Sequence, residues 1–69
     1  MPVEKSIDLT ATGATLDEAV SSAIHRASLT LKGLTSFTVE RIEGTIEDGE
    51  LSYKVLVRIW FVIKEKMHE

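Results

Sequence analysis

The 69-residue chain is long enough for one domain, residues 1–69, and too short for two, since independent domains need roughly 50 residues or more. Its 43% apolar and 28% charged residues are typical of soluble globular proteins and argue against a disordered or membrane-spanning chain. The absence of cysteine excludes disulfides and thiolate metal sites, and the net charge of −3 disfavours nonspecific binding to nucleic acid or anionic lipid.

A strand and a helix are predicted in the first half of the chain. Residues 3–10 alternate between apolar and polar side chains, the pattern of a half-buried strand. A helix is expected to begin after Thr15, because Thr15 and Glu18 have the spacing of a capping box. It is expected to run to about Lys32, with Gly33 in the left-handed conformation that ends many helices. Helical spacing places six apolar residues on one stripe: Leu16, Val20, Ala23, Ile24, Ala27 and Leu31.

Two further strands are predicted in the second half. Alternation resumes over residues 34–46, and its phase shifts near Ile42 and Gly44, which predicts a bulge or bend near Gly44. Asp48 and Gly49 form a strong hairpin-turn signal. The third strand has apolar residues at seven consecutive odd-numbered positions: Leu51, Tyr53, Val55, Val57, Ile59, Phe61 and Ile63.

The predicted order is therefore strand, helix, strand, strand. A right-handed crossover is expected to join the first two strands, and the third strand is expected to insert antiparallel between them. The helix then covers one face of a three-stranded antiparallel sheet. The sequence thus predicts an α+β fold of the βαββ type.

The other face of the third strand carries a second apolar set. Its even-numbered positions include Leu56, Trp60 and Val62, and one amphipathic helix cannot cover both faces of a sheet. A domain of this size without disulfides is usually marginally stable unless copies associate. We therefore predict a homo-oligomer, with these residues at its interface: Leu56, Arg58, Trp60 and Val62.

Support for catalysis in the sequence is thin. Ser21 and Ser22 precede His25 by four and three residues on the predicted helix, but no acidic residue is placed to orient the imidazole. The four glycines are isolated, so no glycine motif for nucleotide phosphates is present. We interpret these side chains as helix-surface residues and expect no enzymatic activity. No signal sequence opens the chain, and we expect a cytoplasmic protein.

Metal binding and RNA binding have equally little support. Glu47, Asp48 and Glu50 could hold a hard cation weakly, but they lack the spacing of an EF-hand loop and are interpreted as a solvated hairpin turn. His68 lies at the terminus, which argues against a two-histidine site. One aromatic residue on the open sheet face and an acidic charge balance argue against an RNA-recognition sheet.

Several short motifs follow one another along the chain. The motif A-I-x-R-A occurs at residues 23–27, T-L-x-x-L at residues 30–34 and F-x-V-x-x-I-x-G-x-I at residues 37–46. With the first strand and the closing segment over residues 53–61, they cover nearly the whole chain, and in this order and spacing they resemble the dodecin family. The resemblance implies a sheet wrapped around its helix and a hollow homododecamer built from trimers.

The resemblance also implies a function, because dodecins bind and store flavin without turning it over. In the family, a Trp at the start of the second strand stacks on the flavin ring and a Gln in the third strand binds its polar edge, between subunits. Ser36 and Lys54 occupy these two positions here. Losing a stacked ring costs on the order of 1–3 kcal/mol, which predicts flavin binding weaker by about tenfold to a hundredfold. Lys54 has donors only, which suits phosphate or another anion.

Trp60 is not expected to replace the missing ring within one subunit. It shares a face with Lys54 but lies six residues away, about 20 Å along a strand. Its expected role is packing at a subunit contact.

Two functions stay open from the sequence. One is a binding and storage protein for a flavin (riboflavin, FMN or FAD) or another nucleotide-like ligand, held in pockets between subunits. The other is a structural assembly of the same architecture that has lost flavin binding and binds another ligand or a cation.

Overall fold

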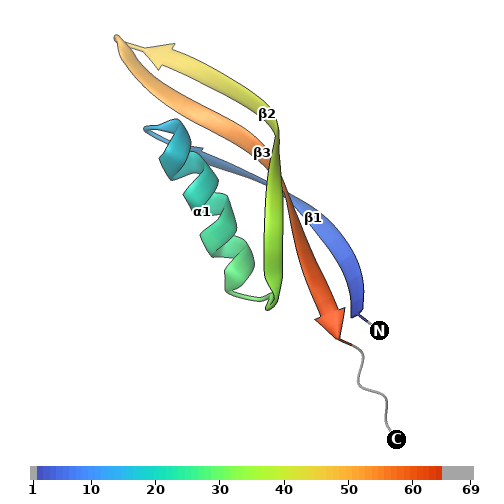
Figure 1. The fold of residues 1–69 in the computed structure, drawn as a ribbon. Helices are drawn as coiled ribbons and strands as arrows, with labels where there is room; N and C mark the ends of the chain where they lie inside the picture. The colour runs from blue at the N-terminus through green and yellow to red at the C-terminus, as the bar shows by residue number, and fades with distance from the viewer. Residues whose placement is uncertain (1, 65–69) are drawn as a thin grey trace, which may run out of the picture.

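The computed structural model describes residues 2–64. In chain order they form β1 (Pro2–Gly13), α1 (Leu16–Ser28), β2 (Leu34–Glu47) and β3 (Glu50–Lys64). The strands form one sheet in the order β1-β3-β2, and α1 lies against one face of it (Figure 1). Within these residues, no helix is long and apolar enough to span a membrane.

The predicted βαββ fold with a central third strand is confirmed. β3 pairs antiparallel with both β1 and β2, so each of its edges is hydrogen-bonded. The predicted hairpin turn is present, since Asp48 and Gly49 have positive φ angles of 52° and 79°. Positive φ at both central residues is what a type I′ hairpin turn requires.

The start of α1 follows the capping prediction. The Thr15 hydroxyl accepts a hydrogen bond from the Glu18 amide at 3.1 Å. The Glu18 carboxylate in turn accepts one from the Ala14 amide at 3.2 Å. Two amide groups that the helix itself cannot satisfy are therefore paired, which fixes where α1 begins.

The helix ends earlier than predicted. Its last residue is Ser28, and the next two amides bond to carbonyl oxygens three residues back, which tightens the chain out of the helix. Gly33 has the predicted positive φ, 77°, but its carbonyl accepts a hydrogen bond from the Val62 amide at 3.1 Å, on the sheet. The prediction that the helix runs to Lys32 is wrong, because the chain must already turn to begin β2 at Leu34.

The bulge in β2 also lies elsewhere than predicted. The pairing register shifts between Val39 and Arg41, which leaves Glu40 as the extra residue, whereas Gly44 pairs regularly with β3. Apolar side chains of β2 change from odd to even positions between Val39 and Ile42, so the extra residue has to lie between those two. The predicted position near Gly44 is therefore wrong.

The core lies where α1 crosses the central strand. Three buried alanines at helical spacing let the helix approach the sheet closely: Ala19, Ala23 and Ala27. They pack against the buried side of β3, formed by Val55, Val57, Ile59 and Phe61. The predicted helix stripe omitted Ala19 and included Leu16, which is 39% exposed.

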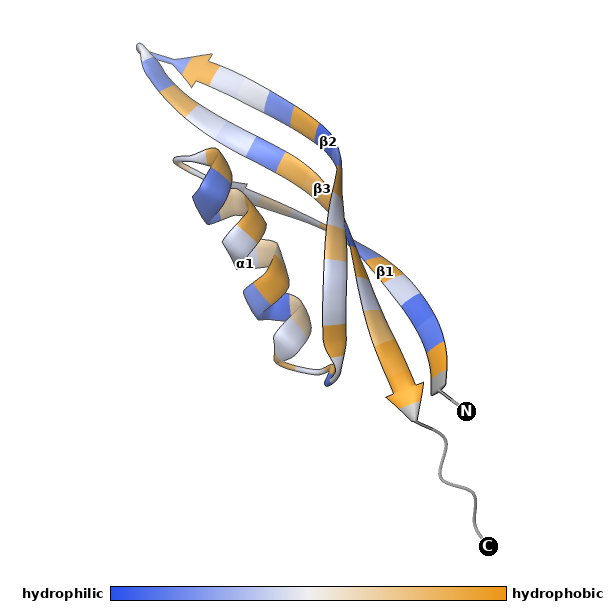
Figure 2. Ribbon diagram, in the orientation of Figure 1, coloured by the Kyte–Doolittle hydropathy of each residue, from blue (hydrophilic) through white to orange (hydrophobic). Residues whose placement is uncertain are grey.

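The molecule is elongated. Its radius of gyration is 15.1 Å, whereas a compact domain of this length has a radius of gyration of about 11 Å. The hairpin of β2 and β3 extends past α1 (Figure 1), and Figure 2 shows hydrophobic positions along this extension. A single chain therefore leaves apolar surface uncovered.

Gly13 provides a test of the contact between β1 and α1. A Cβ atom at Gly13 would lie 2.7 Å from the backbone nitrogen of Ala19, so the backbone would have to shift. We expect Gly13→Ala to lower the free energy of unfolding by about 1–3 kcal/mol, measured by urea denaturation at fixed protein concentration. Gly44→Ala is the control, because its Cβ would meet the Ser52 carbonyl oxygen at an ordinary 3.4 Å. Equal losses for the two variants would contradict this packing argument.

Candidate functional site

We call the side of the sheet that points away from α1 the outer face. β3 contributes its even-numbered residues to this face, because its odd-numbered residues from Val55 to Phe61 are buried on the helix side. The four predicted interface residues all lie on the outer face and are half-buried in the single chain: Leu56, Arg58, Trp60 and Val62.

Ser36 lies on the outer face directly beside Trp60. The two residues are cross-strand partners, and Ser6 of β1 is the partner of Trp60 on its other side. Directly paired residues point to the same face, with Cβ atoms about 4.5–5.5 Å apart. The Thr35 hydroxyl donates a hydrogen bond to the Trp60 carbonyl oxygen at 3.3 Å. The indole of Trp60 therefore stands between two serines.

An ion-pair cluster occupies the neighbouring row of the outer face. Arg58 donates from Nε and Nη2 to the two carboxylate oxygens of Asp8, at 2.9 and 3.2 Å. Its Nη1 lies 3.7 Å from a carboxylate oxygen of Glu40, the bulge residue. These hydrogen bonds lower the pKa of Asp8 below its ordinary value; partial removal from water opposes the shift and charge attraction adds to it. Arg58 is thus already paired within its own chain.

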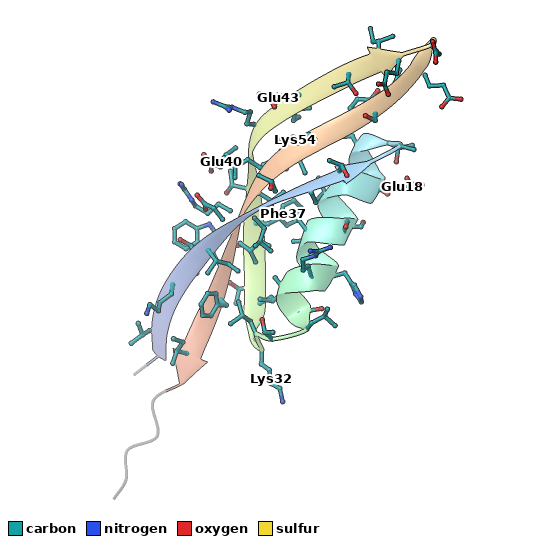
Figure 3. All side chains as sticks on the ribbon, turned by 180° about the vertical axis from the view of Figure 1, so that it is seen from behind. Glu18, Lys32, Phe37, Glu40, Glu43 and Lys54 are labelled. Atoms are coloured by element: carbon teal, nitrogen blue, oxygen red, sulfur yellow. The ribbon has the colours of Figure 1, made fainter. Side chains whose placement is uncertain are left out.

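Lys54 lines two cavities. The larger has a volume of about 230 Å³, and its lining includes Arg26 and Ser22 of α1 and the threonines Thr10 and Thr12 of β1. No carboxylate lines it, so its two cations and three hydroxyls suit an anion. The smaller cavity, of about 120 Å³, also includes Glu43, the cross-strand partner of Lys54 (Figure 3).

Ser36 and Lys54 do not form one site within a single chain. Their positions on β3 are separated by six residues, from the row of Trp60 to that of Lys54, or about 20 Å. Ser36, on the edge strand β2, instead borders a separate, mostly apolar cavity of about 180 Å³ on the helix side, together with Phe37, Ile24 and Ile59. A small ligand that touches both positions has to lie between two copies of the chain.

The other side chains considered in the sequence are not assembled into a site. Ser22 lines the Lys54 cavity, whereas His25 is exposed, and within residues 2–64 no hydrogen bond joins its imidazole to Ser21 or Ser22. Glu47 and its acidic neighbours line a cavity of about 350 Å³ at the hairpin turn. Among the described residues, however, no group of three or more such side chains is placed to hold a metal ion. His68 lies outside the described residues.

Sequence reasoning missed a second apolar area. Ile42, Ile46 and Leu51 lie on the helix side of the sheet but are left uncovered by α1, and they are 53%, 75% and 54% exposed. We call these three residues the hairpin surface. Alternation could not reveal this area, because it does not say how far the helix extends along the sheet or which strands it covers.

Comparison with known proteins agrees with this fold. A family model for dodecin matches residues 3–64. The chain belongs to the dodecin family. A curated dodecin from Thermus thermophilus is 37% identical over 65 residues, which cover 91% of this chain and 94% of that protein.

Solved dodecin structures share the whole architecture. A crystal structure of a variant of the Thermus thermophilus dodecin has a TM-score of 0.88 and 33% identity, and covers 94% of this chain and all of that one. A dodecin from Streptomyces coelicolor has a TM-score of 0.84 and 31% identity, with 94% and 96% covered. A calcium dodecin from Mycobacterium tuberculosis has a TM-score of 0.77 but only 19% identity, with 97% and 99% covered, and shares the fold alone. The predicted family is confirmed.

The pair of Asp8 and Arg58 predicts an acid-dependent stability. Because the pKa of Asp8 is lowered in the folded state, its ionised form stabilises the fold above the ordinary value near 3.8, and this contribution is lost as the pH falls through the lowered pKa. We expect Asp8→Asn to be less stable than the wild type at about pH 6 and to approach it at about pH 2.5, measured by thermal unfolding. Asp48→Asn, in the exposed hairpin turn, is the matched control. A gap between Asp8→Asn and wild type that is independent of pH would contradict the role of this pair.

Proposed function

We propose that this protein is a non-catalytic, cytoplasmic binding and storage protein of the dodecin type. In this proposal it works as a homo-oligomer, a dodecamer built from trimers, and holds a flavin or flavin-like nucleotide between subunits, in pockets bordered by Ser36 and Lys54. The observation that carries the proposal is the chain's uncovered sheet: a family member this extended has to bury its apolar surface against other copies.

Self-association is supported by apolar surface on both sides of the sheet. Among residues 2–64, no element covers the outer face, and α1 leaves the hairpin surface exposed. Contiguous apolar surface of this kind is typical of association sites. The separation of Ser36 from Lys54 by about 20 Å is consistent with a pocket that two copies complete.

The cations near Lys54 favour a phosphorylated ligand. Lys54 and Arg26 line one cavity that no carboxylate lines, and three hydroxyl groups join them there. Hydrogen bonds between cationic side chains and phosphate are among the stronger ones in proteins. FMN or another nucleotide-like ligand therefore fits better than riboflavin, which has no phosphate.

A flavin-free structural assembly is the second candidate. The residues that favour it are Ser36 and Lys54 themselves, since neither reproduces the stacking ring or the two-way hydrogen bonding of the family pattern. In this alternative the oligomer forms in the same way but holds another ligand or a cation.

Titration with FMN and riboflavin separates the two candidates. We expect FMN to bind more tightly than riboflavin by several-fold to about tenfold at low salt, and less so at high salt, because the difference is a charge-assisted contact. Lys54→Gln should remove this preference. Lys32→Gln is the control, because Lys32 lies at the opposite end of the helix from Lys54 (Figure 3). If neither flavin binds at high protein excess, as judged by ultrafiltration, the flavin-free candidate replaces the first.

The hairpin surface provides a test of assembly. Ile46 is 75% exposed in the single chain, so a charge there costs little within the chain but would be buried against another copy. We expect Ile46→Glu to reduce the mass measured by light scattering, whereas Ile46→Leu keeps it. An unchanged mass for Ile46→Glu would exclude the hairpin surface from the subunit interface.

A further inference from the structure

Trp60 occupies the place next to the position where the family pattern has its stacking ring. Ser36 stands at that position, and the register of β2 and β3 makes Trp60 its direct cross-strand partner. Cβ atoms of such partners are about 4.5–5.5 Å apart, within the reach of an aromatic side chain. Trp60 is also the only tryptophan in the chain. A large aromatic residue on β3 thus stands directly beside the position where the family pattern has one on β2.

Trp60 is half-buried in the single chain, so part of its side chain stays accessible. Its partners on both neighbouring strands are serines, Ser6 and Ser36, which are too small to cover an indole. Arg58 in the next row donates two hydrogen bonds to Asp8. Within residues 2–64, no helix or strand covers this side of the sheet. The indole therefore stands on the outer face beside Ser36 with no large partner in its own row.

We propose that Trp60 is the ring-stacking residue of this protein, and that its indole takes the role for which Ser36 has no ring. The ligand class is a flat heteroaromatic ring system, that of a flavin. This inference rests on the proposed function. It assigns Trp60 to ligand contact instead of copy-to-copy packing, and the small Ser36 side chain leaves the space into which the flavin ring fits.

Phe37 is the other aromatic residue near this position. It is 50% exposed, but its cross-strand partner is Ile59, so it lies on the helix side of the sheet. A ligand on the outer face would not touch it. Phe37 lines the apolar cavity beside Ser36 on the helix side, so it offers no ring to the outer face.

Emission of bound FMN reports contact with Trp60 directly. An indole stacked on a flavin donates an electron to the excited ring and quenches its fluorescence, whereas a phenyl ring stacks without quenching it. We expect the fluorescence of FMN bound to the wild type to be quenched. FMN bound to Trp60→Phe should be bright, with the bound fraction measured independently by ultrafiltration. The single tyrosine, Tyr53, lies seven residues along β3, about 23 Å from Trp60, and on the helix side.

Affinity provides the second readout. We expect Trp60→Leu to bind FMN about tenfold to a hundredfold more weakly, the loss typical of one stacked ring. Trp60→Ser should lose affinity in the same way. Combining it with Ser36→Trp should recover that affinity, because the ring returns to the neighbouring strand.

The outcomes separate this inference from the function on which it rests. If the wild type binds no flavin, both fail. If the wild type binds FMN but Trp60→Leu binds equally well, or if FMN stays dark in Trp60→Phe, only the assignment of Trp60 is overturned. Light scattering accompanies each variant. If Trp60→Leu dissociates the oligomer, the fluorescence of FMN bound to Trp60→Phe tests the assignment instead. Bright FMN supports stacking on Trp60, and quenched FMN overturns it.

Discussion

The structure depends on a mismatch of length between one helix and three strands. α1 has 13 residues and is about 20 Å long, whereas the 15 residues of β3 extend for about 50 Å. Close packing of three alanines buries the middle of β3 on one side only. The hairpin surface and the whole outer face are left uncovered by the other described elements, β1 to β3 and α1. Both the proposed assembly and the proposed pocket between copies follow from this uncovered sheet.

The fold could largely be predicted from the sequence, because it rests on local patterns that the structure keeps. Alternation, the Thr15 capping box and the turn at Gly49 each act over a few residues. The errors have a different origin. The helix end and the bulge position are decided by the pairing of β2 with β3, a strand distant from α1 in sequence. Sheet pairing outweighed helical periodicity at Lys32. The change of apolar residues from odd to even positions between Val39 and Ile42 did indicate where the bulge lies. The bulge was instead predicted near Gly44, because glycine tolerates irregular backbone.

The candidate site could be predicted only in part, for the same reason. Resemblance identified Ser36 and Lys54, and alternation placed Trp60 and Arg58 on the uncovered face. The neighbours of these residues could not be read from the sequence. The hydrogen bonds between Arg58 and Asp8 join residues fifty positions apart, and they exist only in the observed register. Arg58 is paired with Asp8 and does not line the anion-suited cavity. The cations that do line it are Lys54 and Arg26.

The extra residue at Glu40 in β2 links the fold to the proposed ligand site. Pairs next to the turn, such as Ile46 with Leu51, would place Ser36 opposite Phe61 on the helix side if the register continued unchanged. The bulge at Glu40 shifts the register by one residue, so that Ser36 faces Trp60 on the outer face, and it also brings the Glu40 carboxylate toward Arg58. Distance along one strand, from Trp60 to Lys54, had argued against a replacement ring. The relevant distance is the short one across the strands from Ser36 to Trp60, which the bulge brings into direct pairing. It allows Trp60 to supply the ring that Ser36 lacks.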